Sequence, residues 1–77
     1  MSGATIQSWT NAHVWLDTGE AVDVKYQVYR SGKKYFLELC DAEDEPIHTL
    51  ELPDGVKLDK SSYDVFLRYI LLDIVAA

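Results

Sequence analysis

The stretch VDVKYQVYRSGKKYFLELC, residues 22–40, decides the fold of this chain. Its first half alternates apolar and polar residues with a period of two, which is the pattern of a strand with one buried face. The pair SG at residues 31–32 predicts a two-residue hairpin turn into a second strand. In that register Val28 faces Tyr35 and the shared face is apolar. A slip by one residue would move every side chain to the other face, so this agreement favours a hairpin.

The opposite face of this hairpin and the segment after it carry many of the acidic residues. In the same register Lys25 faces Glu38, an opposite-charge pair that supports the pairing. The sequence CDAEDEPIHTLEL, residues 40–52, predicts a further hairpin with the four residues AEDE as its loop. His48 then faces Leu39, and the apolar face continues onto the next strand. The acids fall at a solvated loop tip.

The segment HVWLDTGEAV, residues 13–22, predicts a first hairpin. A three-residue loop DTG with a left-handed glycine pairs Val14 with Val22. A loop of even length would instead place Trp15 on the core face, and we prefer the first arrangement. Residues 1–10 leave three alternatives open, namely a short strand, a helical turn or an arm.

Residues 61–76 have the pattern of a helix. Ser61 is expected to cap its N-terminus, with Asp64 in the reciprocal position of a capping box. Apolar side chains recur at helical spacing and form a stripe that should cover the apolar face of the sheet. This first stripe comprises Tyr63, Phe66, Leu67, Ile70, Leu71 and Ile74.

These elements predict an α+β fold in a single domain, residues 1–77. A small antiparallel β-meander of three to four strands is expected over residues 11–53, with one C-terminal helix over 61–76 packed across one face. Residues 1–10 would be an N-terminal arm or a short element.

The helix carries a second apolar stripe on its other side, where a surface helix should be polar. One interpretation is that the N-terminal segment, with Ile6 and Trp9, folds over this stripe. The other is that the stripe is a surface for a partner or for a second copy, and we lean slightly to it because so few residues remain as a cover. The stripe comprises Val65, Tyr69, Leu72 and Ala76, of which Val65, Tyr69 and Leu72 are the predicted self-association residues.

Charge and composition exclude several kinds of ligand. The net charge is −6 and the pI is near 4.6. Nucleic acid as a direct ligand and an anionic membrane surface are both disfavoured, whereas a basic protein partner is allowed. The single cysteine, Cys40, forms no internal disulfide, and neither a signal-peptide pattern nor a membrane-spanning run is expected. We therefore expect a cytoplasmic protein.

Metal and cofactor sites are not expected. The acids of DAEDEP, residues 41–46, imitate the start of a calcium loop. However, Pro46 stands where the loop needs glycine, and Leu52 stands where it needs a bidentate glutamate. The cysteine and the histidines lack the spacing of a zinc site.

An enzyme is not expected either. The predicted register lines up His13, Asp23 and Cys40 across three strands. With the aspartate between them, the thiol and the imidazole would be nearly 10 Å apart, beyond the reach of a base for its nucleophile. The sequence also lacks a phosphate-binding loop and a serine nucleophile motif. We interpret His13 and Asp23 as a surface pair.

The outer sheet face and the acidic stretch form the predicted partner-binding surface. Exposed aromatic side chains beside acids are typical of a protein interface. The competing interpretation is that small sheets leave apolar area exposed anyway. The predicted partner-binding residues are Glu38, Asp41, Glu43, Asp44, Glu45, Trp15, Tyr29 and Phe36.

These features predict a non-catalytic, acidic protein-binding module. We expect an inhibitor or antagonist that docks on a basic protein surface, such as one that holds nucleic acid. Small acidic phage proteins that block host defence, such as anti-CRISPR and anti-restriction proteins, have this size and charge, which is an analogy and not a family resemblance. The alternative is a structural subunit or homodimer built on the second stripe. The competing interpretation of the negative charge is that it only keeps the domain soluble.

Overall fold

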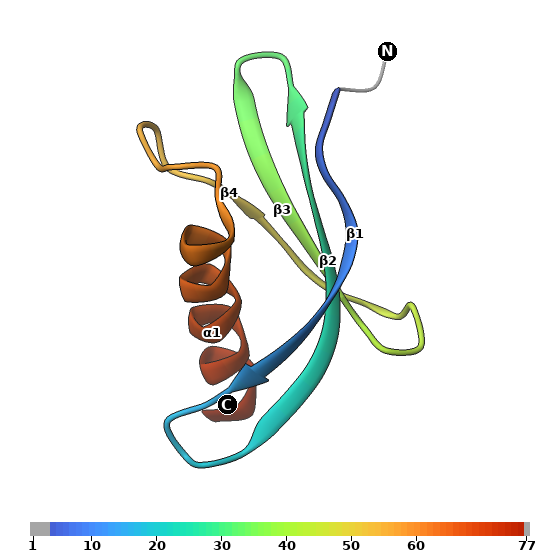
Figure 1. The fold of residues 1–77 in the computed structure, drawn as a ribbon, viewed down its shortest axis with the longest axis vertical. Coiled ribbons are helices and arrows are strands. Elements are labelled where there is room, and N and C mark those ends of the chain that lie inside the picture. Colours follow the sequence, from blue (N-terminus) through green and yellow to red (C-terminus); the bar gives the residue numbers. More distant parts are fainter. Residues whose placement is uncertain (1–3, 77) are drawn as a thin grey trace.

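The computed structural model describes residues 4–76 and shows one antiparallel sheet with one helix (Figure 1). The strands follow one another across the sheet in the order β1-β2-β3-β4, so the α+β meander predicted from the sequence is confirmed. The elements are β1 (Ala4–Trp15), β2 (Ala21–Ser31), β3 (Lys34–Asp41), β4 (Pro46–Glu51) and α1 (Lys60–Ala76).

The predicted register of the central hairpin is wrong by two residues. Val28 pairs with Leu37, not with Tyr35, because the two-residue loop lies at Gly32-Lys33. Gly32 takes a φ of 65° at the first loop position, which is where a type II′ turn needs glycine. A slip of two residues keeps each side chain on its predicted face, so the apolar face survives the error.

The predicted pair of Lys25 with Glu38 is wrong for the same reason. Gln27 lies opposite Glu38 and donates a 2.6 Å hydrogen bond to its carboxylate. Lys25 lies opposite Cys40 and reaches the next loop, where its Nζ is 2.8 Å from Asp44.

The first hairpin is confirmed. Val14 pairs with Val22, and the backbone N–H of Leu16 donates to the carbonyl of Glu20 across a three-residue loop. Gly19 adopts a φ of 91°, the left-handed conformation that a side chain would disfavour.

The predicted register of the last hairpin is also confirmed, since His48 pairs with Leu39. Its loop is one residue shorter than expected, because the N–H of Asp41 donates to the carbonyl of Glu45. A register shift between Leu39 and Cys40 absorbs the difference.

The meander starts earlier than the predicted boundary at residue 11. Residues 4–10 belong to β1, and the pairing of β1 with β2 shifts register around Gln7 and Thr10. Of the three alternatives for residues 1–10, the strand is therefore observed for residues 4–10, and residues 1–3 lie outside the described part of the chain.

The helix begins one residue before the predicted start, and its cap is Asp59, not Ser61. The Asp59 carboxylate accepts a hydrogen bond from the N–H of Ser62 at 2.9 Å. This bond from the Ser62 backbone, with a smaller contribution from the Ser61 backbone, lowers the pKa of the Asp59 carboxyl. Asp64 instead pairs with Arg68 one turn later, at 2.9 Å.

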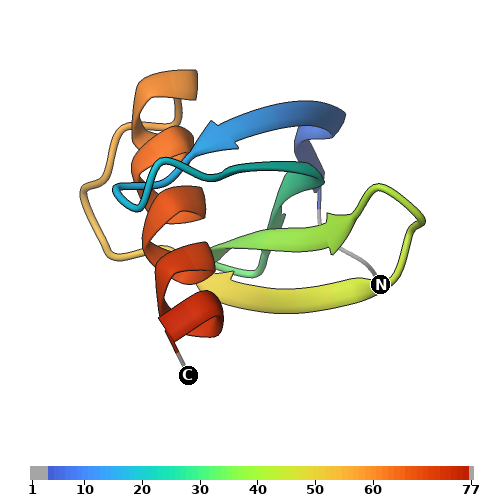
Figure 2. The ribbon, with the colours of Figure 1, turned by 90° about the horizontal axis from the view of Figure 1, so that it is seen from below.

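The core lies between α1 and one face of the sheet. Tyr63 of α1 packs at a tilt against Tyr26 of β2, with ring centroids 5.8 Å apart. Figure 2 shows α1 crossing the strands from the side of β1 to the side of β4. The core residues are Val14, Leu16, Val24, Tyr26, Val28, Leu37, Leu39, Leu52, Tyr63, Leu67, Ile70 and Leu71.

Two residues of the first helical stripe are less buried than predicted. Phe66 packs against the core but is only half-buried, and Ile74 is 46% exposed. Both face the side of α1 next to β4, where the sheet ends and no described strand covers the helix.

Candidate functional site: the groove between α1 and β4

An apolar groove runs between α1 and the edge strand β4. One part is a hollow of about 200 Å³ between the end of β4 and the middle of the helix. A smaller hollow of about 90 Å³ continues it toward the C-terminal end of α1, and Leu50 and Tyr69 line both parts. We call this the α1–β4 groove; its lining residues are His48, Leu50, Glu51, Pro53, Val65, Phe66, Tyr69, Ile70, Asp73 and Ile74.

The groove exposes large apolar side chains. Val65 is 62% exposed and Tyr69 is 74% exposed, although both lie on a helix that packs on the sheet. They stand four residues apart, so they share one side of α1. Exposed apolar side chains gathered in one hollow indicate an interaction surface, whereas scattered ones do not.

The structure places the predicted self-association residues in two different environments. Val65 and Tyr69 lie in the groove, whereas Leu72 is half-buried against the core. The interpretation that the N-terminal segment covers the stripe is wrong. Ile6 and Trp9 lie in β1, and Trp9 lines a hollow with Cys40 and Pro46 that includes no residue of α1.

Leu50, Pro53 and Phe66 were not predicted as site residues. Phe66 was predicted to cover the sheet, and Leu50 falls on the same face of its strand as His48, which the predicted register places on the apolar face. The signal that could have identified both as site residues is their position at the end of the sheet. Leu50 belongs to the last strand of the meander, so nothing from the sheet lies beyond it, and Phe66 lies next to Val65 on the helix.

The outer edge of β4 is open to solvent along the described residues. In an antiparallel pair, residues alternate between bonding inward and facing outward. Leu52 donates to the carbonyl of Tyr35 at 2.8 Å, so Leu50 and His48 also bond inward to β3. The N–H and C=O groups of Thr49 and Glu51 therefore point away from the sheet.

The predicted outer face holds aromatic residues in two separate places. Trp15 is 60% exposed at one end and contacts the His13 ring edge-on, with centroids 5.3 Å apart. Tyr29 and Phe36 stack at 5.4 Å and are half-buried. Part of the apolar surface of each ring is therefore buried against the other ring.

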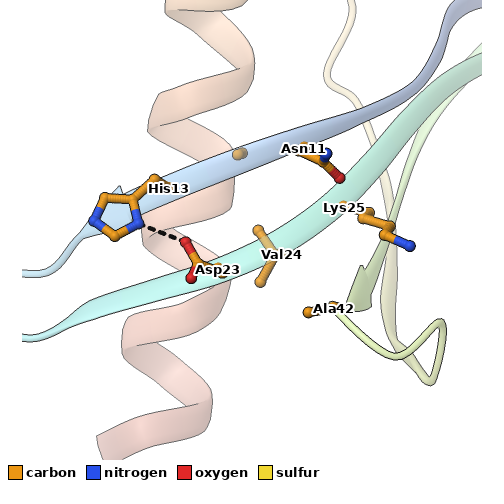
Figure 3. Close-up of a pocket in the computed structure, with 7 residues that line it drawn as sticks. Asn11, His13, Asp23, Val24, Lys25 and Ala42 are labelled. Carbon is orange, nitrogen blue, oxygen red and sulfur yellow. Dashed lines mark hydrogen bonds and ion pairs between the residues drawn. The ribbon is translucent and has the colours of Figure 1, made fainter.

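A polar depression of about 500 Å³ lies beside β1, β2 and the loop after β3 (Figure 3). His13 and Asp23 form the predicted surface pair in it, with Nδ1 and Oδ1 2.5 Å apart. Both side chains are more than half exposed, so the pair contributes little to stability. Lys25 points toward the loop that carries Ala42.

The predicted alignment of His13, Asp23 and Cys40 is not observed. Asp23 lies opposite His13, but Cys40 lies opposite Lys25, two residues further along β2. Burial raises the pKa of the Cys40 thiol, and nearby Asp44 adds to the effect. A buried thiol that stays protonated is a weak nucleophile.

The acidic loop uses several of its carboxylates to hold its own structure. Asp41 accepts hydrogen bonds from the backbone N–H groups of Glu43 and Glu45, at 2.8 and 3.0 Å. Asp44 adopts a φ of 68° and bonds to Lys25, and this bond raises the pKa of Lys25. Of the predicted partner-binding acids in this loop, only the side chains of Glu43 and Glu45 extend without a protein partner among residues 4–76.

Two further observations concern what residues 4–76 contain. They hold no cluster of three or more His, Cys, Asp or Glu side chains arranged for a metal ion. Their one helix lacks the length and the apolar character that crossing a membrane requires.

Comparison with known proteins gives one partial relative. No protein-family model matches the sequence, and no solved structure matches it significantly. A polyamine aminopropyltransferase of Thioalkalivibrio sulfidiphilus (strain HL-EbGR7) is 34% identical over 61 residues. The match covers 79% of this chain but 22% of that protein, so the chain spans about a fifth of the length of the relative it matches.

Proposed function

We propose that this chain is a non-catalytic protein-binding module that docks through the α1–β4 groove. The observation that carries the proposal is the exposure of Tyr69, at 74%, inside an apolar hollow. Tyrosine is among the residues that dominate protein interfaces, because its ring buries a large area and its hydroxyl keeps a polar contact. Truncating such a residue costs a complex far more than it costs the free domain.

The charge favours a basic partner. Asp73 is the acidic residue on the helix side of the groove. Glu51 lies at its rim, where its carboxylate is 3.6 Å from Lys34 Nζ. With a net charge of −6, the chain attracts basic surfaces and repels acidic ones. A module of this kind on a nucleic-acid-binding surface would exclude nucleic acid, and would thereby act as an antagonist. A cytoplasmic location is part of this proposal, and the single free thiol of Cys40 is compatible with it.

The partial relative is compatible with a modular role. In the aminopropyltransferase, the matching segment is about a fifth of a longer protein. A segment that makes up only part of a longer protein can act as a unit that is combined with other units. For this chain we propose association with another protein rather than aminopropyl transfer by the described residues alone.

A homodimer is the second candidate function. The exposed pair Val65 and Tyr69 is a surface that a second copy could bury, and helix faces of this kind often pair across a two-fold axis. Charge opposes it, since two chains of −6 repel each other at low salt.

The test is capture of partners from lysate of the native host by the wild-type chain and by Tyr69→Asp. A partner lost with Tyr69→Asp and retained on washing with high salt would support docking through the groove. Trp15→Asp is the matched control, because it places the same charge on the opposite sheet face at a similarly exposed aromatic. A partner lost with Trp15→Asp, or with Glu43→Ala and Glu45→Ala together, but retained with Tyr69→Asp would overturn it.

A further inference from the structure

We propose that the α1–β4 groove binds an extended peptide segment that joins the sheet as a fifth strand beside β4, with apolar side chains under α1 and basic ones on the outer face. This inference rests on the proposed function and names its partner class. It follows from three separate features, namely the open edge of β4, the overhang of α1 and the net charge of the chain.

The open edge supplies main-chain hydrogen bonds. Thr49 and Glu51 direct their N–H and C=O groups outward, and no described strand pairs with them. An edge of this kind is a template for strand addition, in which backbone bonds hold the peptide and alternate side chains provide specificity. β4 has six residues, enough for a short peptide to pair along it.

The helix extends past the last strand. Lys60 and Asp64 lie near β1, and Asp73 and Ile74 lie near β4, so α1 crosses the whole sheet (Figure 2). Its 17 residues span about 25 Å, whereas four strands span about 14 Å between the outermost axes.

A fifth strand would therefore still lie under α1. Ile74 is exposed although it lies in the last turns of a helix whose neighbouring turns are buried, as expected of a side chain that lacks a strand beneath it. Apolar residues of an added strand would contact Ile74 and Tyr69 from the sheet side.

The side-chain pattern of the peptide follows from the pleat. Residues of β4 on the helix side are His48 and Leu50, whereas Thr49 and Glu51 lie on the other face. Side chains of an added strand alternate in the same way. Apolar residues would therefore fill the groove. The other side chains would lie on the outer face with Glu51, which Lys34 already pairs at 3.6 Å, so the net charge of −6 is what favours basic residues there.

A second copy of this chain fits the groove less well. Antiparallel pairing of two β4 strands would bring together two chains with a net charge of −6 each, and with them two copies of Asp73. Like charges across an interface cost affinity. A segment with alternating apolar and basic residues avoids this repulsion.

The experiment uses a synthetic peptide of about eight residues that alternates lysine and valine, enough to pair along β4. Calorimetry measures its affinity for the full chain. Two control peptides isolate the chemistry: one alternates glutamate and valine, and the other has the same lysines and valines in two blocks. Both controls are expected to bind at least about tenfold more weakly, because they lose charge complementarity or alternation.

N-methylation tests the strand itself. Backbone N–H groups of alternate residues point to the same edge of a strand, so methylating one alternate set blocks the edge that faces β4 and methylating the other set does not. Methylating the set that faces β4 is expected to weaken binding by about fivefold to tenfold for each hydrogen bond lost, and methylating the other set is expected to leave the affinity unchanged.

The chain offers a matched pair of variants. Thr49→Pro removes an outward N–H, and proline is tolerated on an edge strand. Thr49→Val keeps this N–H and should bind as the wild type does. Amide exchange gives a direct readout: Thr49 and Glu51 should gain protection when the peptide binds, whereas His48 and Leu50 are protected already.

The outcomes separate this inference from the proposed function. Equal binding by both N-methylated sets, or unchanged exchange at Thr49, would overturn strand addition even where Tyr69→Asp still abolishes capture of a protein partner. A concentration-dependent dimer that Tyr69→Asp abolishes would assign the groove to a second copy and would also overturn it. Loss of peptide binding with only one of the two methylated sets, together with loss of binding by Thr49→Pro, would establish strand addition.

Discussion

In the structure the apolar side chains of α1 form one stripe that faces the sheet and one that faces the groove. They differ from the predicted stripes because Ile74 lies with Val65 and Tyr69, and although their residues are similar in type, their burial is opposite. The stripe that faces the sheet is 1–5% exposed, and it comprises Tyr63, Leu67, Ile70 and Leu71. The stripe that faces the groove is 46–74% exposed, and it comprises Val65, Tyr69 and Ile74. The comparison teaches that position over the sheet, and not residue type, separates the side chains that stabilise this domain from those that remain available for a partner.

The largest loss of unfolding free energy is expected from a substitution in the buried stripe. Leu67 is 1% exposed, and Leu67→Ala should cost about 2–5 kcal/mol of unfolding free energy, which is a large part of the stability of a domain this small. Tyr69→Ala on the other stripe should change stability by about 0.5 kcal/mol or less. Urea denaturation of both variants measures the difference, and equal losses would break the comparison.

For partner binding we expect the opposite order, with the larger loss from the exposed stripe. Tyr69→Asp should weaken partner binding by about 2 kcal/mol or more, because it places a charge at the centre of an apolar hollow. Its thermal melting should match that of the wild type. Calorimetry and melting on the same preparation test this, and a Tyr69→Asp variant that binds normally would contradict the proposed docking site.

The acids of the loop after β3 show the same division between structural and exposed roles. Asp41 holds two backbone N–H groups, so Asp41→Ala should cost about 1–2 kcal/mol, and Asp41→Asn, which keeps an oxygen acceptor, should cost less. Glu43→Ala should leave the unfolding free energy unchanged within error. A large loss with Glu43→Ala would reveal a structural role that its exposed position does not suggest.

The smallest expected change in stability concerns the N-terminal cap of α1, the helix that carries both stripes. Asp59 caps α1, and its hydrogen bonds lower its pKa in the folded state. A lowered pKa means that the ionised cap stabilises the fold above the ordinary aspartate pKa, and that this contribution is lost as the pH falls through the folded-state pKa.

Thermal melting at neutral and acidic pH tests this cap. Asp59→Ala should lower the melting temperature at neutral pH, and its difference from the wild type should shrink in acid. Asp59→Asn keeps a neutral cap, so its effect should be smaller and less dependent on pH. A difference that stays constant from neutral pH into acid would show that the carboxylate charge is irrelevant.

Periodicity was enough to predict the fold and the faces of the sheet. The turn at Gly19 was confirmed because its left-handed glycine fixes the loop locally. The pairing of His48 with Leu39 was confirmed although its loop is one residue shorter than predicted, because a register shift between Leu39 and Cys40 absorbs the difference. The central register was wrong because Gly32 can occupy either position of a two-residue turn, and both choices leave Val28 on the same face.

The site was harder to predict than the fold. Spacing along α1 identified Val65 and Tyr69, but the groove also needs Leu50 at the end of the sheet, and a helical pattern carries no information about where a sheet stops. The sequence likewise could not show that the carboxylate of Asp41 is bonded to the loop backbone and that of Asp44 to Lys25, since those contacts depend on backbone geometry.

Amide hydrogen exchange of the chain, free and bound to a captured partner, tests the central claim most directly. Our account predicts new protection at Thr49 and Glu51 on β4 and in α1 around Tyr69, with the loop at residues 42–45 unchanged. Protection confined to that loop, or to the outer sheet face around Trp15, would contradict it and would assign the binding surface to the acidic stretch or to the outer aromatic residues.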